Sequence, residues 1–157
     1  IGKLFYQSHK RLDEGRYLEA KAIFEKLMND KRVLEPTASW AGVEAVISAW
    51  LAGDTEKAEA ASARLGQHIQ NRKVASDSDV TLLSKQLSGT EIISKLKKGG
   101  DSMALLQMMA VALKNWEIGA WDLAVPVFKA VEETELPKES PLRVYHKITK
   151  KYLTLKI

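Results

Sequence analysis

The stretch GRYLEAKAIF at residues 15–24 decides the fold, because its pattern returns as GAWDLAVPVF at residues 119–128. In both copies an aromatic residue follows the glycine at the second position, an alanine at the fifth and a phenylalanine at the ninth. Glycine allows a tight turn at the end of a helix, and the small alanine lets two helices approach closely. The repeated spacing therefore predicts a hairpin of two helices near each end of the chain.

Apolar residues recur at helical spacing along the whole chain, and the alternation typical of strands is scarce. We expect helix pairs at 3–30, 37–72, 79–98 and 101–135, followed by a capping helix at 141–155. Glycines at 15, 53, 89 and 119 repeat at roughly 30 to 40 residues, a period typical of helical solenoids. The predicted fold is all-α: a right-handed array of helix hairpins that forms one domain over residues 1–157.

The glycine motif resembles that of the tetratricopeptide repeat family, whose hairpins carry the pattern Gly-x-Tyr-x-x-Ala-x-x-x-Phe. The matching positions are Gly15, Tyr17, Ala20, Phe24, Gly119, Trp121, Ala124 and Phe128, with a partial match at Gly53 and Ala58. The resemblance implies a non-catalytic protein–protein interaction or scaffold domain. Such a domain holds a partner peptide or helix in a concave groove formed by the first helices of successive hairpins.

The resemblance also projects ten residues onto this groove, and most of them are apolar. They are Phe5, His9, Leu12, Trp40, Val43, Ile47, Trp50, Met109, Leu113 and Trp116. In one interpretation the groove is open and receives an amphipathic helix or an extended apolar peptide. In the other, these residues form internal core, and the domain is a structural spacer or a self-association module. The solvent exposure of Trp40, Trp50 and Trp116 separates the two interpretations.

The chemistry-bearing residues do not form a catalytic or metal-binding pattern. The chain holds no cysteine, which excludes disulfides, thiolate zinc sites and cysteine nucleophiles. Its three histidines, His9, His68 and His146, are scattered without ligand spacing, and no phosphate-loop or nucleophile motif occurs. We therefore expect no enzyme activity, no bound metal and no cofactor.

Basic side chains gather towards the end of the sequence. Residues 138–157 contain one acidic residue, Glu139, and the basic residues Lys138, Arg143, Lys147, Lys150, Lys151 and Lys156. Most of these cations share one side of the predicted last helix, which suits the polar outer face of a capping helix. The alternative function of this helix is contact with nucleic acid or with an anionic membrane surface.

The most apolar run, at residues 103–113, is shorter than the roughly 20 residues that a membrane span needs. The chain begins at Ile1 and is rich in alanine. We therefore expect a piece of a longer bacterial-type polypeptide, with any targeting segment upstream. Homo-oligomerisation and the compartment, cytoplasmic or exported, stay open.

Overall fold

The computed structural model describes residues 2–88, 101–136, 138 and 143–156, and these residues form helices and no strand. The helices are α1 (Gly2–Asp13), α2 (Tyr17–Asn29), α3 (Thr37–Leu51), α4 (Thr55–Asn71), α5 (Asp79–Ser88), α7 (Asp101–Glu117), α8 (Trp121–Glu133) and α9 (Val144–Lys156). The all-α prediction is thereby confirmed for the described residues. Residues 89–98 of the predicted hairpin 79–98 lie outside them, and so does the start of the predicted capping helix at residue 141.

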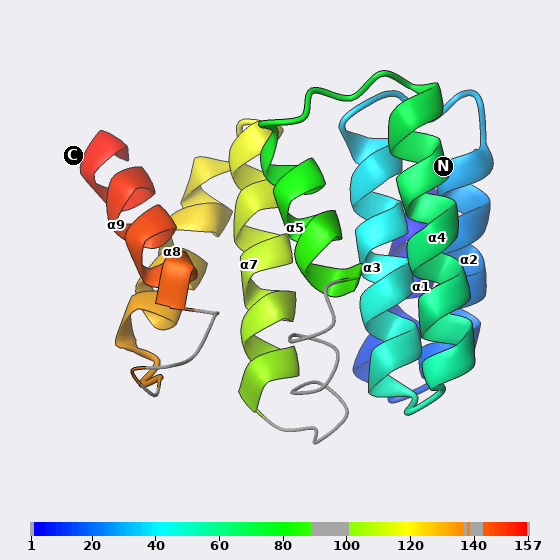
Figure 1. Cartoon of the computed structure of the whole chain (residues 1–157), viewed down its shortest axis with the longest axis horizontal. Helices are drawn as coiled ribbons and strands as arrows, with labels where there is room; N and C mark the ends of the chain where they lie inside the picture. Colours follow the sequence, from blue (N-terminus) through cyan, green and yellow to red (C-terminus); the bar gives the residue numbers. More distant parts are fainter. Residues whose placement is uncertain (1, 89–100, 137, 139–142, 157) are drawn as a thin grey trace. The chain divides into compact units, whose positions relative to one another are not determined.

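Contacts divide the chain into two compact units, Ile1–Gly99 (unit 1) and Gly100–Ile157 (unit 2). In unit 1, α1 packs on α2, α2 on α3 and α3 on α4, and α5 contacts both α3 and α4 (Figure 1). In unit 2, α8 packs on both α7 and α9. The single domain over 1–157 and the solenoid stacking of its hairpins stay predictions.

Three glycines end their helices with the same local structure, which confirms the turns predicted at Gly15, Gly53 and Gly119. Their φ angles of +77°, +75° and +81° lie in the left-handed region that favours glycine. At the first turn, the glycine N–H donates to the Leu12 carbonyl at 3.1 Å, and the next N–H donates to the Arg11 carbonyl at 2.8 Å. These paired bonds form a Schellman motif, which satisfies the last carbonyls of the helix.

A fourth turn, after α4, has the same pair of hydrogen bonds without a glycine. Lys73 has a φ of 54°, its N–H donates to the Gln70 carbonyl at 3.1 Å, and the Val74 N–H donates to the Ile69 carbonyl at 3.0 Å. A lysine backbone is strained in this conformation. We expect Lys73→Gly to raise the free energy of unfolding by about 0.5–1 kcal/mol, measured by urea denaturation.

The control for this change is Ala63→Gly, at an exposed position in the middle of α4. It introduces the same flexible residue where the backbone is helical, so it should lower the free energy of unfolding by about 1 kcal/mol. Equal losses of stability in the two variants would show that the turn at residue 73 carries no strain.

Helix α3 is the buried centre of unit 1, since every residue from 38 to 50 is buried. The helix contains no lysine or arginine, and its one carboxylate is that of Glu44. Gly42 marks a close approach of its neighbours: a Cβ at this position would lie 2.5 Å from Met28 Sδ on α2 and 2.6 Å from Leu65 Cδ1 on α4. Both neighbouring helices therefore pack close to the α3 backbone.

Candidate functional site

The four predicted groove residues of α3 belong to the core of unit 1. Trp40 and Val43 are 0% exposed, Ile47 is 1% exposed and Trp50 is 7% exposed. Their burial follows from the packing of α2, α4 and α5 against α3. In this fold the four side chains offer a partner almost no surface.

The three predicted groove residues of α1 lie on one helix face, which packs towards α2 and α3. Leu12 is buried, and Phe5 and His9 are half-buried. His9 Nε2 lies 3.4 Å from Glu44 Oε2 on α3, and the His9 ring meets the Phe24 ring of α2 edge-on, with centroids 5.3 Å apart. This face of α1 therefore holds three helices together.

In unit 2, the predicted residue Trp116 lies at the centre of an aromatic cluster. Its ring centroid is 5.9 Å from Trp121, 6.1 Å from Phe128 and 4.9 Å from Tyr152. Phe128 and Tyr152 stack with centroids 5.0 Å apart and planes 11° apart. The cluster joins α7, α8 and α9, and two of its members, Trp121 and Phe128, come from the glycine motif.

The ten predicted groove residues thus fall into two units, with those of α1 and α3 in unit 1 and those of α7 in unit 2. The two other residues of α7, Met109 and Leu113, are buried. Burial on this scale favours the interpretation in which the projected groove is filled internally. An open groove at these positions stays a prediction.

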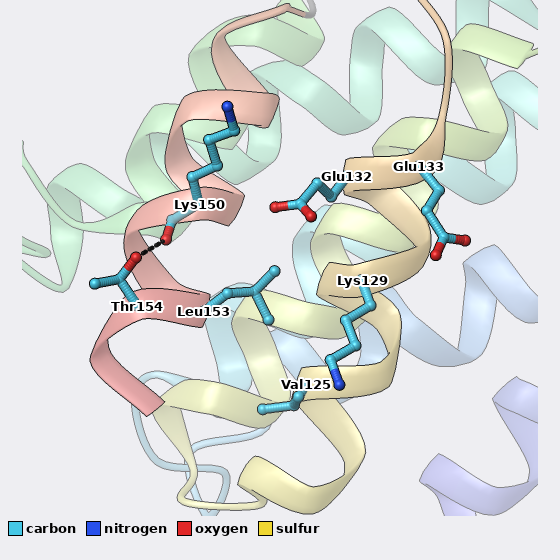
Figure 2. A pocket seen from close by; sticks show the side chains of 7 residues that line it. All are labelled: Val125, Lys129, Glu132, Glu133, Lys150, Leu153 and Thr154. Carbon is cyan, nitrogen blue, oxygen red and sulfur yellow. Dashed lines mark hydrogen bonds between the residues drawn. The ribbon is translucent and has the colours of Figure 1, made fainter. Parts of the chain in front are cut away.

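An open pocket lies between α8 and α9 of unit 2 (Figure 2). Its volume of about 600 Å³ falls within the range of about 300–1,000 Å³ that is usual for binding sites. The lining residues are Val125, Lys129, Glu132 and Glu133 on α8 and Lys150, Leu153 and Thr154 on α9. We call this pocket the α8–α9 groove.

The groove has an apolar floor and a charged rim. On each helix most lining residues are three or four positions apart, so they occupy one helix face. Val125 and Leu153 supply the apolar floor, and Figure 2 shows Leu153 directed from α9 towards α8. The Thr154 hydroxyl donates to the Lys150 carbonyl at 2.8 Å, so it bonds within its own helix. The arrangement suits docking of an apolar surface within a polar border.

A polar cluster in unit 1 contains a hydroxyl, a carboxylate and an imidazole, the three groups of a nucleophilic triad. Glu35 Oε1 lies 2.7 Å from His68 Nε2, and the Ser39 hydroxyl donates to Glu35 Oε2 at 2.6 Å. In a nucleophilic triad the imidazole must accept the hydroxyl proton. Here the carboxylate is the partner of both other groups, so the cluster fastens the start of α3 to α4.

Within the described residues, no three His, Cys, Asp or Glu side chains are grouped so that they could hold a metal ion. Among the same residues, no helix is both long enough and apolar enough to cross a membrane.

No model of a known protein family matches the chain, and no match to it was found among curated proteins or solved structures. The likeness to tetratricopeptide repeats therefore depends on the sequence motif and its helix turns.

Proposed function

We propose that the chain is a non-catalytic protein-interaction module, a tetratricopeptide-like array of helix hairpins, that docks a helical segment of a partner protein in the α8–α9 groove. The observation that carries the proposal is a contrast in exposure between two surfaces. The α3 side chains projected onto the family groove are covered, whereas the α8–α9 groove is open and has an apolar floor.

A helix is the partner element that this site fits best. Two packed helices leave a channel between them, and a third helix can lay an apolar stripe along it. Val125 on α8 and Leu153 on α9 would each contact this apolar stripe. Charged groups around an apolar centre are the usual arrangement of a protein interface, and they fix the orientation of the partner.

A second function, a structural spacer, is favoured for unit 1 by the burial of α3. Its small residues allow close packing on more than one side, and the Glu35–His68 and His9–Glu44 contacts join separate elements of the same unit. Under this proposal unit 1 supplies rigidity, and binding is a property of unit 2.

The docking proposal predicts a specific loss of binding in Leu153→Asp. The probe is a fluorescein-labelled helical peptide of about 15 residues, with leucine at every third or fourth position and glutamine elsewhere. A carboxylate in the groove floor would be desolvated without a partner, so affinity measured by fluorescence anisotropy should fall at least about tenfold. Val125→Asn is the second variant and should weaken binding in the same direction.

The matched control is Leu123→Asp, which places the same carboxylate on α8 at a leucine that is 63% exposed and does not line the groove. It should bind the peptide as the wild type does, and circular dichroism should show equal helix content in all variants. Equal affinities of Leu153→Asp and Leu123→Asp, or no binding by the wild type, would refute docking in this groove.

A further inference from the structure

The described part of α9 presents lysines without counter-charges. Lys147, Lys150 and Lys151 are all exposed, and the helix contains no aspartate or glutamate. Among the described residues, no carboxylate forms an ion pair with any of the three amines. A row of like charges that the fold leaves unpaired repels itself and attracts an anionic partner.

Three surface arginines of unit 1 are paired with carboxylates. Arg16 pairs with Glu19, Arg32 with Asp30, and Arg64 with Glu25, each at 2.5–2.7 Å. Other exposed cations of unit 1, such as Lys3, Lys10 and Lys26, form no ion pair within the described residues, so pairing is a property of these arginines. What distinguishes α9 is that its three exposed lysines lie on a helix that contains no acidic residue.

The lysines of α9 lie beside the α8–α9 groove. Lys150 lines the groove, and Lys147 lies one helical turn before it on the same face. The charged residues that line the groove are Lys129, Glu132 and Glu133 on α8 and Lys150 on α9, and the exposed Lys147 and Lys151 of α9 lie outside this lining. Figure 2 shows the Glu132 carboxylate directed towards α9 and that of Glu133 directed away from it. The charge on the α9 wall is thus entirely basic, whereas the α8 wall carries one lysine and two glutamates.

From this asymmetry we propose that the docked segment is an acidic amphipathic helix, with its apolar stripe on Val125 and Leu153 and its carboxylates against the lysines of α9. This proposal rests on the proposed function, because it names the chemistry of the partner at the same groove. Complementary charge of this kind selects the partner and speeds association. Nucleic acid and anionic lipid also attract lysines, but neither presents an apolar stripe of helix width to a groove between two helices.

The test compares three labelled helical peptides that share the leucine stripe and carry glutamate, glutamine or lysine at the flanking positions. The glutamate peptide should bind at least about tenfold more tightly than the lysine peptide at about 50 mM salt, and the difference should shrink at about 500 mM salt. Lys150→Glu should weaken binding of the glutamate peptide about fivefold, and Glu132→Gln should strengthen it about twofold. Lys10→Glu makes the same charge change at an exposed lysine of α1 and should leave the affinity unchanged.

The outcomes separate the two proposals. If the three peptides bind equally and all depend on Leu153, the acidic partner is refuted and groove docking stands. If no peptide binds, both are refuted. Phosphatidylserine vesicles and a duplex DNA are tested as two further binding partners. Tight binding of either one, lost in Lys150→Glu and retained in Leu153→Asp, would replace the acidic helix by that polyanion.

Discussion

Trp40→Ala is expected to lower the free energy of unfolding of unit 1 by about 3–5 kcal/mol, the usual effect of removing a fully buried tryptophan. Trp40 is 0% exposed and is among the largest side chains of the core. Its removal leaves a cavity at the first turn of α3, which the helices packed around α3 cannot close completely. Urea denaturation followed by circular dichroism measures the change, and hydrogen exchange of α2, α3 and α4 assigns it to unit 1.

The control for Trp40→Ala is Tyr6→Ala, since Tyr6 is an aromatic residue of the same unit that is 67% exposed. Its loss should change the free energy of unfolding by no more than about 0.5 kcal/mol. A similarly small effect of Trp40→Ala would show that the tryptophan lies at an open surface. That result would restore the family groove as the candidate site.

Gly42→Leu is expected to lower the free energy of unfolding by about 3 kcal/mol or more, at the upper end of the range for overpacked cores. The first atom of the new side chain would already lie 2.5 Å from Met28 Sδ and 2.6 Å from Leu65 Cδ1. The remaining atoms would separate α2 and α4 from α3. Thermal unfolding should show a large fall in Tm for unit 1.

Gly66→Leu is the matched change, because Gly66 lies on α4 and a Cβ there meets nothing within 4 Å. Leucine forms helix better than glycine, so this variant should gain up to about 1 kcal/mol in free energy of unfolding. Both substitutions replace a helical glycine by leucine and so change helix propensity in the same way. A loss of stability at residue 42 and a gain at residue 66 would therefore be due to the difference in packing. A stability gain in both variants would contradict close packing of three helices at Gly42.

The sequence predicted most helix boundaries because turn chemistry is local. Gly15, Gly53 and Gly119 adopt the positive φ that the motif required. Asp54, a residue type favoured at helix starts, caps α4 by accepting a hydrogen bond from the Lys57 N–H at 3.0 Å. The start of α3 has no such local cap: the Glu35 carboxylate accepts the Ser39 N–H at 3.3 Å. That bond depends on a chain path that local spacing does not reveal.

The projected groove shows how a family pattern and a composition signal can disagree. The pattern placed Trp40, Val43, Ile47 and Trp50 on an accessible surface. The same helix has no lysine or arginine and one carboxylate among its residues, and a helix that lacks a polar face is usually buried. That signal was present in the sequence and favoured the internal core.

The α8–α9 groove could not be predicted from the sequence, because it depends on the pairing of two helices. From spacing alone, Glu132 and Glu133 are typical of a solvated helix end, and the lysines of α9 are typical of a capping helix. The stacking of Phe128 on Tyr152 brings these two surfaces together. Charge on each helix was visible in the sequence, but the apolar floor between the two helices was not.

The most direct test of docking in the α8–α9 groove is an NMR measurement. It maps the amide chemical shifts that change when the glutamate-flanked peptide is added to the ¹⁵N-labelled chain. Docking in the α8–α9 groove predicts changes centred on residues 125–133 of α8 and 147–154 of α9. Changes centred on residues 5–12 of α1 and 40–50 of α3, with α8 and α9 unaffected, would contradict it.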